Sequence, residues 1–404
     1  MSAPPQAAPA SPVGYGRVFA VPEFRAVFAA HTLSMLGVIV SEVALSVLVY
    51  DTTGSALLSA LTFALGFLPY ALGGTLLAPV ADRFPARRVL VTCDLVCAGC
   101  VAVMAGPGTG IGVLLALRCC LAVVSPVFTG TRTATLADVL GDGDLFVLGR
   151  SLLRIVAQSA LLVGYGLGGL LLAAVTPRHA LLITVATFLA SAALLRLGTR
   201  RRPARAPGPT DTPPGLRTLF AHPRIRLLLL LFWVPSAFVV VPEALAAPYA
   251  DALGSGPVGL GLLMCGLPAG TVAGELFIGA RLRPAARERL VLPLLRLSLL
   301  PCAGYALHPG LAGSLLLLVL SGAGSAYTLG LDQWFVRAVP EELRGRAMTV
   351  LSAGLMTVQG VGMALAGVAA QAVGVRAAVA GAGALGTLCC CGLALWSRTR
   401  APEA

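Results

Sequence analysis

The sequence predicts an all-α membrane protein with twelve transmembrane helices, arranged as two pseudo-symmetric six-helix bundles. Three observations predict this fold: the composition, the alternation of long apolar runs with short arginine-bearing turns, and an internal repeat. Of the 404 residues, 57% are hydrophobic and only 11% are charged, whereas soluble proteins carry about 25% charged residues. This composition excludes an ordinary soluble protein.

The apolar runs have the length of membrane spans, for which about 20 apolar residues are needed. Charged residues and Pro/Gly turns divide the chain into twelve such runs. They cover roughly residues 25 to 50, 55 to 80, 88 to 106, 110 to 131, 148 to 174, 179 to 198, 225 to 249, 257 to 280, 290 to 307, 311 to 335, 347 to 370 and 376 to 396. An even number of spans returns both termini to the same side.

The distribution of arginine predicts which side that is. Alternate loops carry arginine clusters within 83–88, 200–205, 281–289 and 337–346. The loops on the opposite side hold only Arg178 and Arg376. Because cytoplasmic loops are enriched in positive charge, both termini are expected in the cytoplasm. The net charge of +12 follows from this topology, and the short clusters build no continuous basic face for nucleic acid.

The longest polar interruption, at 199–218, is rich in Pro and Arg and is interpreted as a cytoplasmic linker. The N-terminus is rich in Pro and Ala, without the charged start and compact apolar core of a signal peptide. The expected domains are a disordered cytoplasmic tail (1–17), an N-terminal bundle (18–198), the linker (199–222), a C-terminal bundle (223–397) and a second tail (398–404).

The two bundles resemble each other at a spacing of about 200 residues. The matched features are Pro22 to Arg25 with Pro223 to Arg226, Asp51, Gly54 and Ser55 with Asp251, Gly254 and Ser255, and Leu68-Pro69 with Leu267-Pro268. Their common order favours duplication of one six-helix unit. Two such units joined by a linker are typical of transporters that rock around a central site.

The segment 68–91, LPYALGGTLLAPVADRFPARRVLV, resembles the signature loop between helices 2 and 3 of the major facilitator superfamily. That signature reads Gly, three residues, Asp, Arg or Lys, any residue, Gly, any residue and two basic residues. The matching positions are Ala78, Asp82, Arg83, Arg87 and Arg88, and Ala78 and Pro85 stand where the family has glycines. The resemblance extends over about residues 18 to 397. Within the family, the chain looks most like bacterial drug and metabolite exporters, including the group around the siderophore exporters.

The resemblance implies an exporter in the inner membrane of a bacterium, which moves an amphipathic drug, antibiotic or metabolite by alternating access against proton entry. It also implies that Asp82 pairs with an arginine at the end of the fourth helix, such as Arg132, and so latches the outward-open state together with Arg83, Arg87 and Arg88. The alternative for this loop is a purely topological role.

Among the ionisable residues inside predicted spans, where charge is costly and functional candidates gather, three lie far from the cytoplasmic ends. They are Glu42, Arg118 and Glu243. In the family, helices 1, 4, 7 and 10 line the central cavity, so the resemblance implies that all three reach one water-filled space. There they would couple proton or substrate movement. The alternative is a structural ion pair between Glu42 and Arg118.

Other polar and aromatic residues are candidates for lining the cavity, namely Phe128, Gln158, Tyr165, Trp233 and Gln359. We expect Asp94 to lie within about two turns of the cytoplasmic face and to reach the interface. His31 is expected to be packed or interfacial.

Several motifs predict no chemistry. The G-x-G-x-x-G segments at 164–169 and 381–386 lie inside spans, where small residues let helices approach closely. A phosphate-binding loop is impossible because the chain has no lysine. Cys97 and Cys100 match C-x-x-C without a second pair or a nearby histidine. We therefore expect no cofactor, no metal and no enzymatic activity.

The expected partners are a small-molecule substrate, protons and the lipid bilayer, with no nucleic acid, and the chain is expected to be a monomer. Two alternative functions remain: an uncoupled facilitator or importer of the same fold, and a membrane sensor that binds a ligand without transport.

Overall fold

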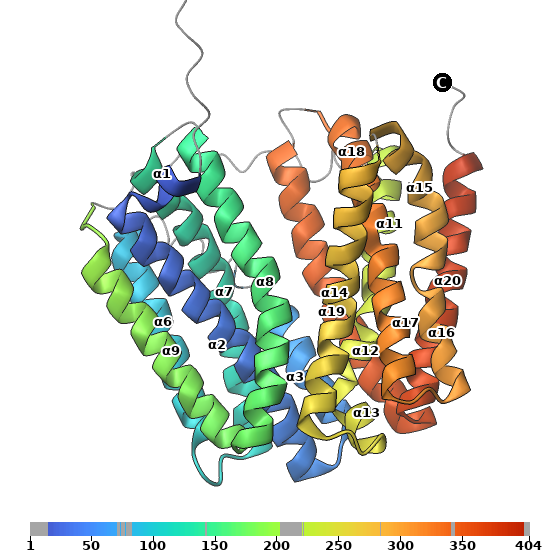
Figure 1. Cartoon of the computed structure of the whole chain (residues 1–404), viewed down its shortest axis with the longest axis horizontal. Helices are drawn as coiled ribbons and strands as arrows, with labels where there is room; N and C mark the ends of the chain where they lie inside the picture. The colour runs from blue at the N-terminus through green and yellow to red at the C-terminus, as the bar shows by residue number, and fades with distance from the viewer. Residues whose placement is uncertain are drawn as a thin grey trace, which may run out of the picture.

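The computed structural model describes residues 15–70, 73, 77, 83–141, 144–202, 220, 222–282, 284–340 and 344–399. Over these ranges the chain forms helices and turns and no strand. Figure 1 shows two groups of long helices side by side, the first from α1 to α9 and the second from α11 to α20. The all-helical prediction is confirmed.

The first half contains seven helices in the described ranges: α1 (Tyr15–Phe19), α2 (Pro22–Thr53), α3 (Ala56–Phe67), α6 (Ala86–Ala105), α7 (Ile111–Leu140), α8 (Asp144–Ala174) and α9 (Pro177–Gly198). The second half contains α11 (Pro223–Val239), α12 (Val241–Ala244), α13 (Ala246–Ala252), α14 (Gly256–Arg281), α15 (Pro284–Leu297), α16 (Leu300–Ala303), η1 (Gly304–Leu307), α17 (Leu311–Gly324), η2 (Ser325–Tyr327), α18 (Thr328–Ala338), α19 (Arg344–Val373) and α20 (Val375–Thr399).

Membrane-spanning character is confirmed over the described ranges. Ten helices are long and apolar enough to cross a bilayer, and two shorter apolar helices cover Ala56–Phe67 and Ser159–Ala174. The shorter ones fall in the predicted spans 55 to 80 and 148 to 174. The total of twelve spans remains a prediction.

Matched positions of the sequence repeat play the same structural role in each half. Pro22 and Pro223 each stand at the start of the first long helix of a half, where the fixed φ of proline suits the first turn. Gly54 and Gly254 both adopt a left-handed backbone, with φ of 64° and 60°. Glycine is suited to this conformation because it lacks a Cβ.

Three predicted spans are interrupted rather than continuous, among them 311 to 335, which is divided into α17, η2 and α18. The run 225 to 249 is divided into α11, α12 and α13, and the run 290 to 307 into α15, α16 and η1. Pro242 and Pro301 begin the short helices α12 and α16. Proline removes a backbone donor and its ring clashes with the preceding turn, so the helix changes course there. The break at α12 places Glu243 on a single helical turn.

The two halves contact each other through α8 with α14, α3 with α19, and α2 with α13. On α8, a Cβ added to Gly169 would lie 2.7 Å from the Cα of Gly261 on α14. The prediction that the first glycine motif permits close helix contact is confirmed. Further contacts join the ends of helices: Tyr50 donates to Asp251 at 3.2 Å, and Gln371 donates to Ser55 at 3.1 Å.

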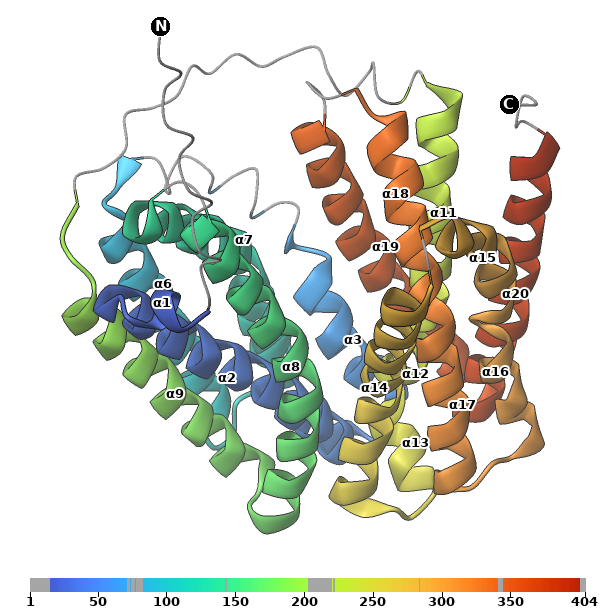
Figure 2. The ribbon, with the colours of Figure 1, turned by 45° about the horizontal axis from the view of Figure 1, so that its top comes forward.

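These contacts gather at one end of the molecule. In Figures 1 and 2 the halves converge at the lower end, around α13 and the start of α3, and diverge toward the end where α1 and the last turn of α20 lie.

Candidate functional site

The first part of the site is a buried ion pair in the N-terminal half. Glu42 on α2 accepts a hydrogen bond from Nη2 of Arg118 on α7, and the two side chains are 15% and 6% exposed. Arg118 also donates from Nε to the carbonyl of Thr62 on α3, at 3.1 Å. The pair therefore ties three helices of this half together.

The second part of the site joins the two halves. The hydroxyl of Tyr165 on α8 donates to the carboxylate of Glu243 on α12. Tyr165 is buried and lies within electrostatic reach of Glu42 and Arg118 as well. The structure thus brings the three predicted ionisable residues into one group, which we call the central polar cluster: Glu42, Arg118, Tyr165 and Glu243. Tyr165 links the two halves through its hydroxyl.

A cavity of about 160 Å³ opens beside the ion pair within the N-terminal half. Its polar lining includes Glu42, Asp94, Arg118 and Arg132, and Phe128 forms part of its apolar wall. Pockets for drug-sized ligands measure about 300 to 1,000 Å³. This cavity therefore suits water or one end of a larger molecule.

The side chain of Asp94 points into the protein, so the prediction that it reaches the interface is wrong. It is 1% exposed on α6 and accepts hydrogen bonds from Ser34 at 2.8 Å and Ser191 at 2.6 Å. Two hydroxyl donors on neighbouring helices satisfy the carboxylate internally, so the side chain has no need to reach water. The sequence contains both serines but does not reveal that they face Asp94.

Replacing Asp94 by alanine should therefore destabilise the protein by about 1–3 kcal/mol, because the buried hydroxyl of Ser34 loses its acceptor and that of Ser191 keeps only the carbonyl of Ala30. Thermal unfolding of the purified protein in detergent measures the effect. Ser191→Ala, which removes only one of the two donors, is the matched control and should lower the stability less. An Asp94→Ala protein as stable as the parent would contradict the proposed role.

Arg132 and His31 form a second buried polar contact in the same half. Nη1 of Arg132 lies against Nδ1 of His31, and its guanidinium carbon lies 4.0 Å from the ring centroid of Phe128. This confirms that His31 is packed inside the protein. Nη2 of Arg132 is buried without a partner among the described residues. The predicted latch partner, Asp82, lies outside the described residues.

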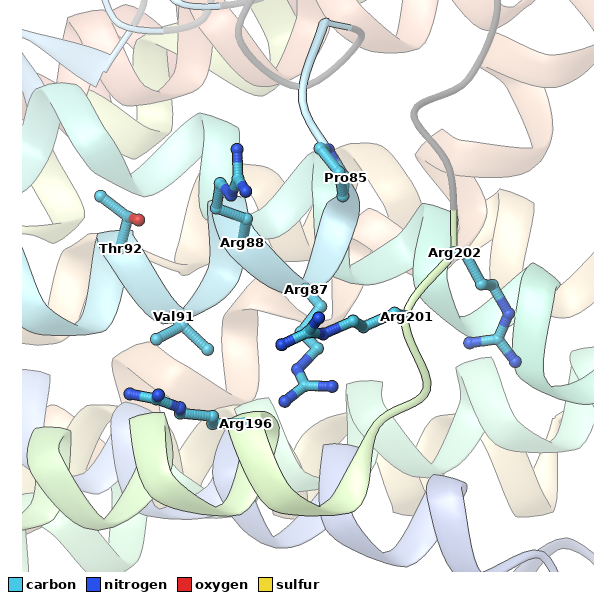
Figure 3. Close-up of a pocket in the computed structure, with 8 residues that line it drawn as sticks. All are labelled: Pro85, Arg87, Arg88, Val91, Thr92, Arg196, Arg201 and Arg202. Carbon is cyan, nitrogen blue, oxygen red and sulfur yellow. The ribbon is translucent and has the colours of Figure 1, made fainter.

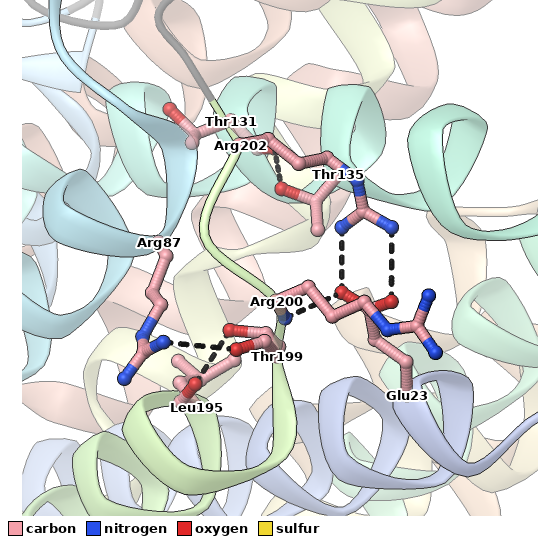
Figure 4. Close-up of polar contacts among 8 residues, drawn as sticks. All are labelled: Glu23, Arg87, Thr131, Thr135, Leu195, Thr199, Arg200 and Arg202. Carbon is pink, nitrogen blue, oxygen red and sulfur yellow. Dashed lines mark hydrogen bonds and ion pairs between the residues drawn. The ribbon is translucent and has the colours of Figure 1, made fainter.

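The other members of the predicted latch lie near the ends of α6 and α9. Arg83 and Arg88 are exposed, and Arg87 donates to the carbonyl of Thr199 at 3.1 Å. Figure 4 shows this bond beside a second group, in which Glu23 of α2 receives both the backbone N–H of Arg200 and the guanidinium of Arg202. These contacts attach the chain after α9 to the starts of α2 and α6.

The remaining lining candidates have separate positions. Trp233 on α11 donates to the carbonyl of Leu351 at 3.1 Å and packs against Gly354. Both contacts join α11 to α19 within the C-terminal half. Gln359 is half-buried on α19. The side chain of Gln158 lies outside the described residues.

The comparisons with known proteins agree with this architecture. The sequence profile of the Major Facilitator Superfamily matches residues 27–329. No curated protein matches the chain in sequence. Among solved structures, the chain is similar to a bacterial homologue of the human lysosomal transporter Spinster in an inward-facing, occupied conformation. The TM-score is 0.74 at 17% identity, covering 97% of this chain and 100% of that one.

Two other similar structures are transporters as well. A POT family transporter in complex with a thioalcohol-conjugated peptide gives a TM-score of 0.73 at 11% identity, covering 93% of this chain and 96% of that one. A bacterial homologue of the iron transporter ferroportin in its inward-facing state gives a TM-score of 0.67 at 15% identity, covering 92% of this chain and 98% of that one. At these identities the likeness shows the fold alone. Together with the profile match over most of its length, it shows that the chain belongs to the major facilitator superfamily.

Proposed function

We propose that the protein is a secondary active transporter that exports an amphipathic small molecule, such as a drug or a metabolite of the siderophore type, in exchange for protons. The observation that carries the proposal is the central polar cluster, in which a carboxylate of the second half meets a hydroxyl of the first. Carboxylates buried in membrane proteins are costly and mark ion or proton pathways.

The cluster suits coupling because one of its bonds crosses between the moving parts. When the halves rock apart at their contacting end, the Tyr165–Glu243 bond breaks and Glu243 gains access to water. A carboxyl group that alternates between a buried contact and water changes its relative preference for the charged and neutral forms. Glu243 would then take up a proton in one state and release it in the other.

The Glu42–Arg118 pair would serve this cycle differently. Both partners belong to the N-terminal half, so rocking of the halves leaves the pair intact. Its charges compensate each other and polarise the cavity beside them. In this proposal the pair orients a polar end of the substrate, while Glu243 carries the proton.

The contacts between the halves lie at the end away from the termini, which suits a conformation open toward the side that holds the termini. The inward-facing conformation of the Spinster and ferroportin homologues supports this assignment. The arginine-rich loops at the same end support a cytoplasmic location for it.

Export of a fluorescent amphipathic dye from bacterial cells that express the protein tests the proposal. Expressing cells should hold less dye than cells with an empty vector, and a protonophore should abolish the difference. If the difference persists with the protonophore present, proton coupling is wrong and the uncoupled facilitator takes its place. If expressing cells accumulate more dye, the direction of transport is wrong.

A further inference from the structure

A second cavity, of about 340 Å³, lies outside the central polar cluster, where α6 begins and α9 ends. Figure 3 shows its lining, which comes from the start of α6, from α9 and from the chain directly after α9. Five of the eight lining residues are arginines: Arg87, Arg88, Arg196, Arg201 and Arg202. We call this cavity the arginine pocket.

The positive charge of the arginine pocket is only partly compensated. Arg202 pairs with Glu23 through two bonds, of 2.5 and 2.9 Å. For Arg88, Arg196 and Arg201, the described part of the chain supplies no ion-pair partner. Arg87 and Arg88 also stand in the first turn of α6, where the helix dipole is positive and favours an anion. An anion in the pocket would reduce the repulsion among the arginines and the repulsion between Arg87, Arg88 and the positive end of the helix dipole.

The pocket lies at the depth of lipid headgroups. Ala86–Ala105 and Pro177–Gly198 are both candidate membrane spans, so α6 leaves the apolar layer near Ala86 and α9 near Gly198. Arginines at the ends of spans are placed to meet the charged groups of lipids.

An apolar surface continues from the pocket along the same two helices. Leu197, directly after Arg196, is 86% exposed, and Leu189 on α9 and Leu95 on α6 are 47% and 49% exposed. In Figures 1 and 2, α6 and α9 lie on the flank of the molecule that faces away from the second half. A ligand with a charged head and long apolar chains fits both the arginine pocket and the apolar surface of α6 and α9. A free phosphate ion would occupy only the arginine pocket.

The second half offers a natural comparison. Near the start of α15, a cavity is lined by Glu288 and Arg289 of α15 and by Trp334 of α18. There Glu288 accepts hydrogen bonds from Arg337, at 3.1 and 2.5 Å, and from Trp334, at 3.2 Å. This cavity therefore has a carboxylate in its lining, whereas the arginine pocket has none and only Arg202 has an ion-pair partner among the described residues.

We propose that the arginine pocket binds the phosphate group of an anionic phospholipid, with Arg87, Arg196 and Arg201 as donors and the acyl chains lying along α6 and α9. Arginine suits this role because its planar guanidinium donates two parallel hydrogen bonds to phosphate oxygens. The bound lipid links α6 to the chain that follows α9.

Native mass spectrometry of the purified full-length protein tests the proposal, with phosphatidylglycerol and phosphatidylcholine offered at equal concentration. The parent protein should retain phosphatidylglycerol preferentially. The triple variant R87Q/R196Q/R201Q should lose about tenfold or more of its apparent affinity for that lipid. The variant R224Q/R281Q/R289Q removes three exposed arginines from the same end of the second half, and should keep the preference.

The outcomes separate the possible ligands. A triple variant that still prefers phosphatidylglycerol would overturn the proposal, as would a parent protein that retains both lipids equally. Displacement of the lipid by an equal concentration of inorganic phosphate would assign the pocket to a free anion instead. Should the triple variant fail to fold, the parent protein alone decides, since an ionic contact with a net-anionic headgroup requires that rising salt weakens retention of phosphatidylglycerol more than that of zwitterionic phosphatidylcholine. Equal weakening of both, or none, would overturn the proposal.

Discussion

Replacing Glu243 by glutamine should abolish proton-driven uphill transport and leave substrate exchange intact. The amide keeps the size of the side chain and can still accept a hydrogen bond from Tyr165, but it carries no titratable proton. The experiment uses proteoliposomes with an imposed pH gradient. One pH unit supplies about 1.4 kcal/mol for each proton exchanged, enough for an about tenfold substrate gradient. The variant should build no gradient under the same conditions.

Substrate exchange at equal pH on both sides distinguishes this result from a folding defect. The halves still rock with substrate bound, so labelled substrate should enter Glu243→Gln vesicles at a rate close to that of the parent protein. Glu288→Gln is the matched control, because Glu288 lies outside the central polar cluster and pairs with the exposed Arg337. It should retain both activities. An uphill gradient in the Glu243→Gln protein would remove Glu243 from the coupling mechanism.

The second large effect is expected for Gly169→Leu, which should block closure of the contacting end. A Cβ at Gly169 would lie 2.7 Å from the Cα of Gly261 and 2.8 Å from the carbonyl oxygen of Pro257. These atoms belong to the backbone of α14 and have no rotamer to change, so α8 and α14 must separate. Because transport needs both conformations, we expect its rate to fall by about tenfold or more.

Spin labels at positions 55 and 371 report the conformation directly, since Ser55 and Gln371 are hydrogen-bonded across the two halves. The ten free cysteines are first replaced so that only the introduced sites carry a label. The distance between the labels should lengthen in Gly169→Leu. Gly381→Leu is the control, because a Cβ at Gly381 has nothing within 4 Å. An unchanged distance in Gly169→Leu would show that this contact does not control closure.

Sequence reasoning reached Glu42, Arg118 and Glu243 because a charge inside an apolar run is conspicuous. The alternative of an ion pair between Glu42 and Arg118 also named the contact that the structure shows, whereas the partner of Glu243 was not foreseen. Tyr165 was predicted only as a candidate for lining the cavity, and in the structure its hydroxyl donates to Glu243. The contacts of Arg132 with His31 and Phe128 were not foreseen either, and its predicted pairing with Asp82 stays a prediction because Asp82 lies outside the described residues. Each of these contacts joins residues from different helices, and the helix sequences carry no record of which neighbours meet.

The sequence by itself determined the helical, membrane-spanning character of the chain and the residues at which charge enters the membrane, and it predicts the division into two related halves. These features depend on local composition, because each span must satisfy its own backbone within the apolar layer. Only the tertiary structure decided which polar side chains face one another. A membrane helix such as α2 is apolar toward both lipid and protein, so its sequence shows no amphipathic stripe to mark the buried face. Asp94 illustrates the difference, because its burial is explained by Ser34 on α2 and Ser191 on α9, two helices that only folding brings beside it.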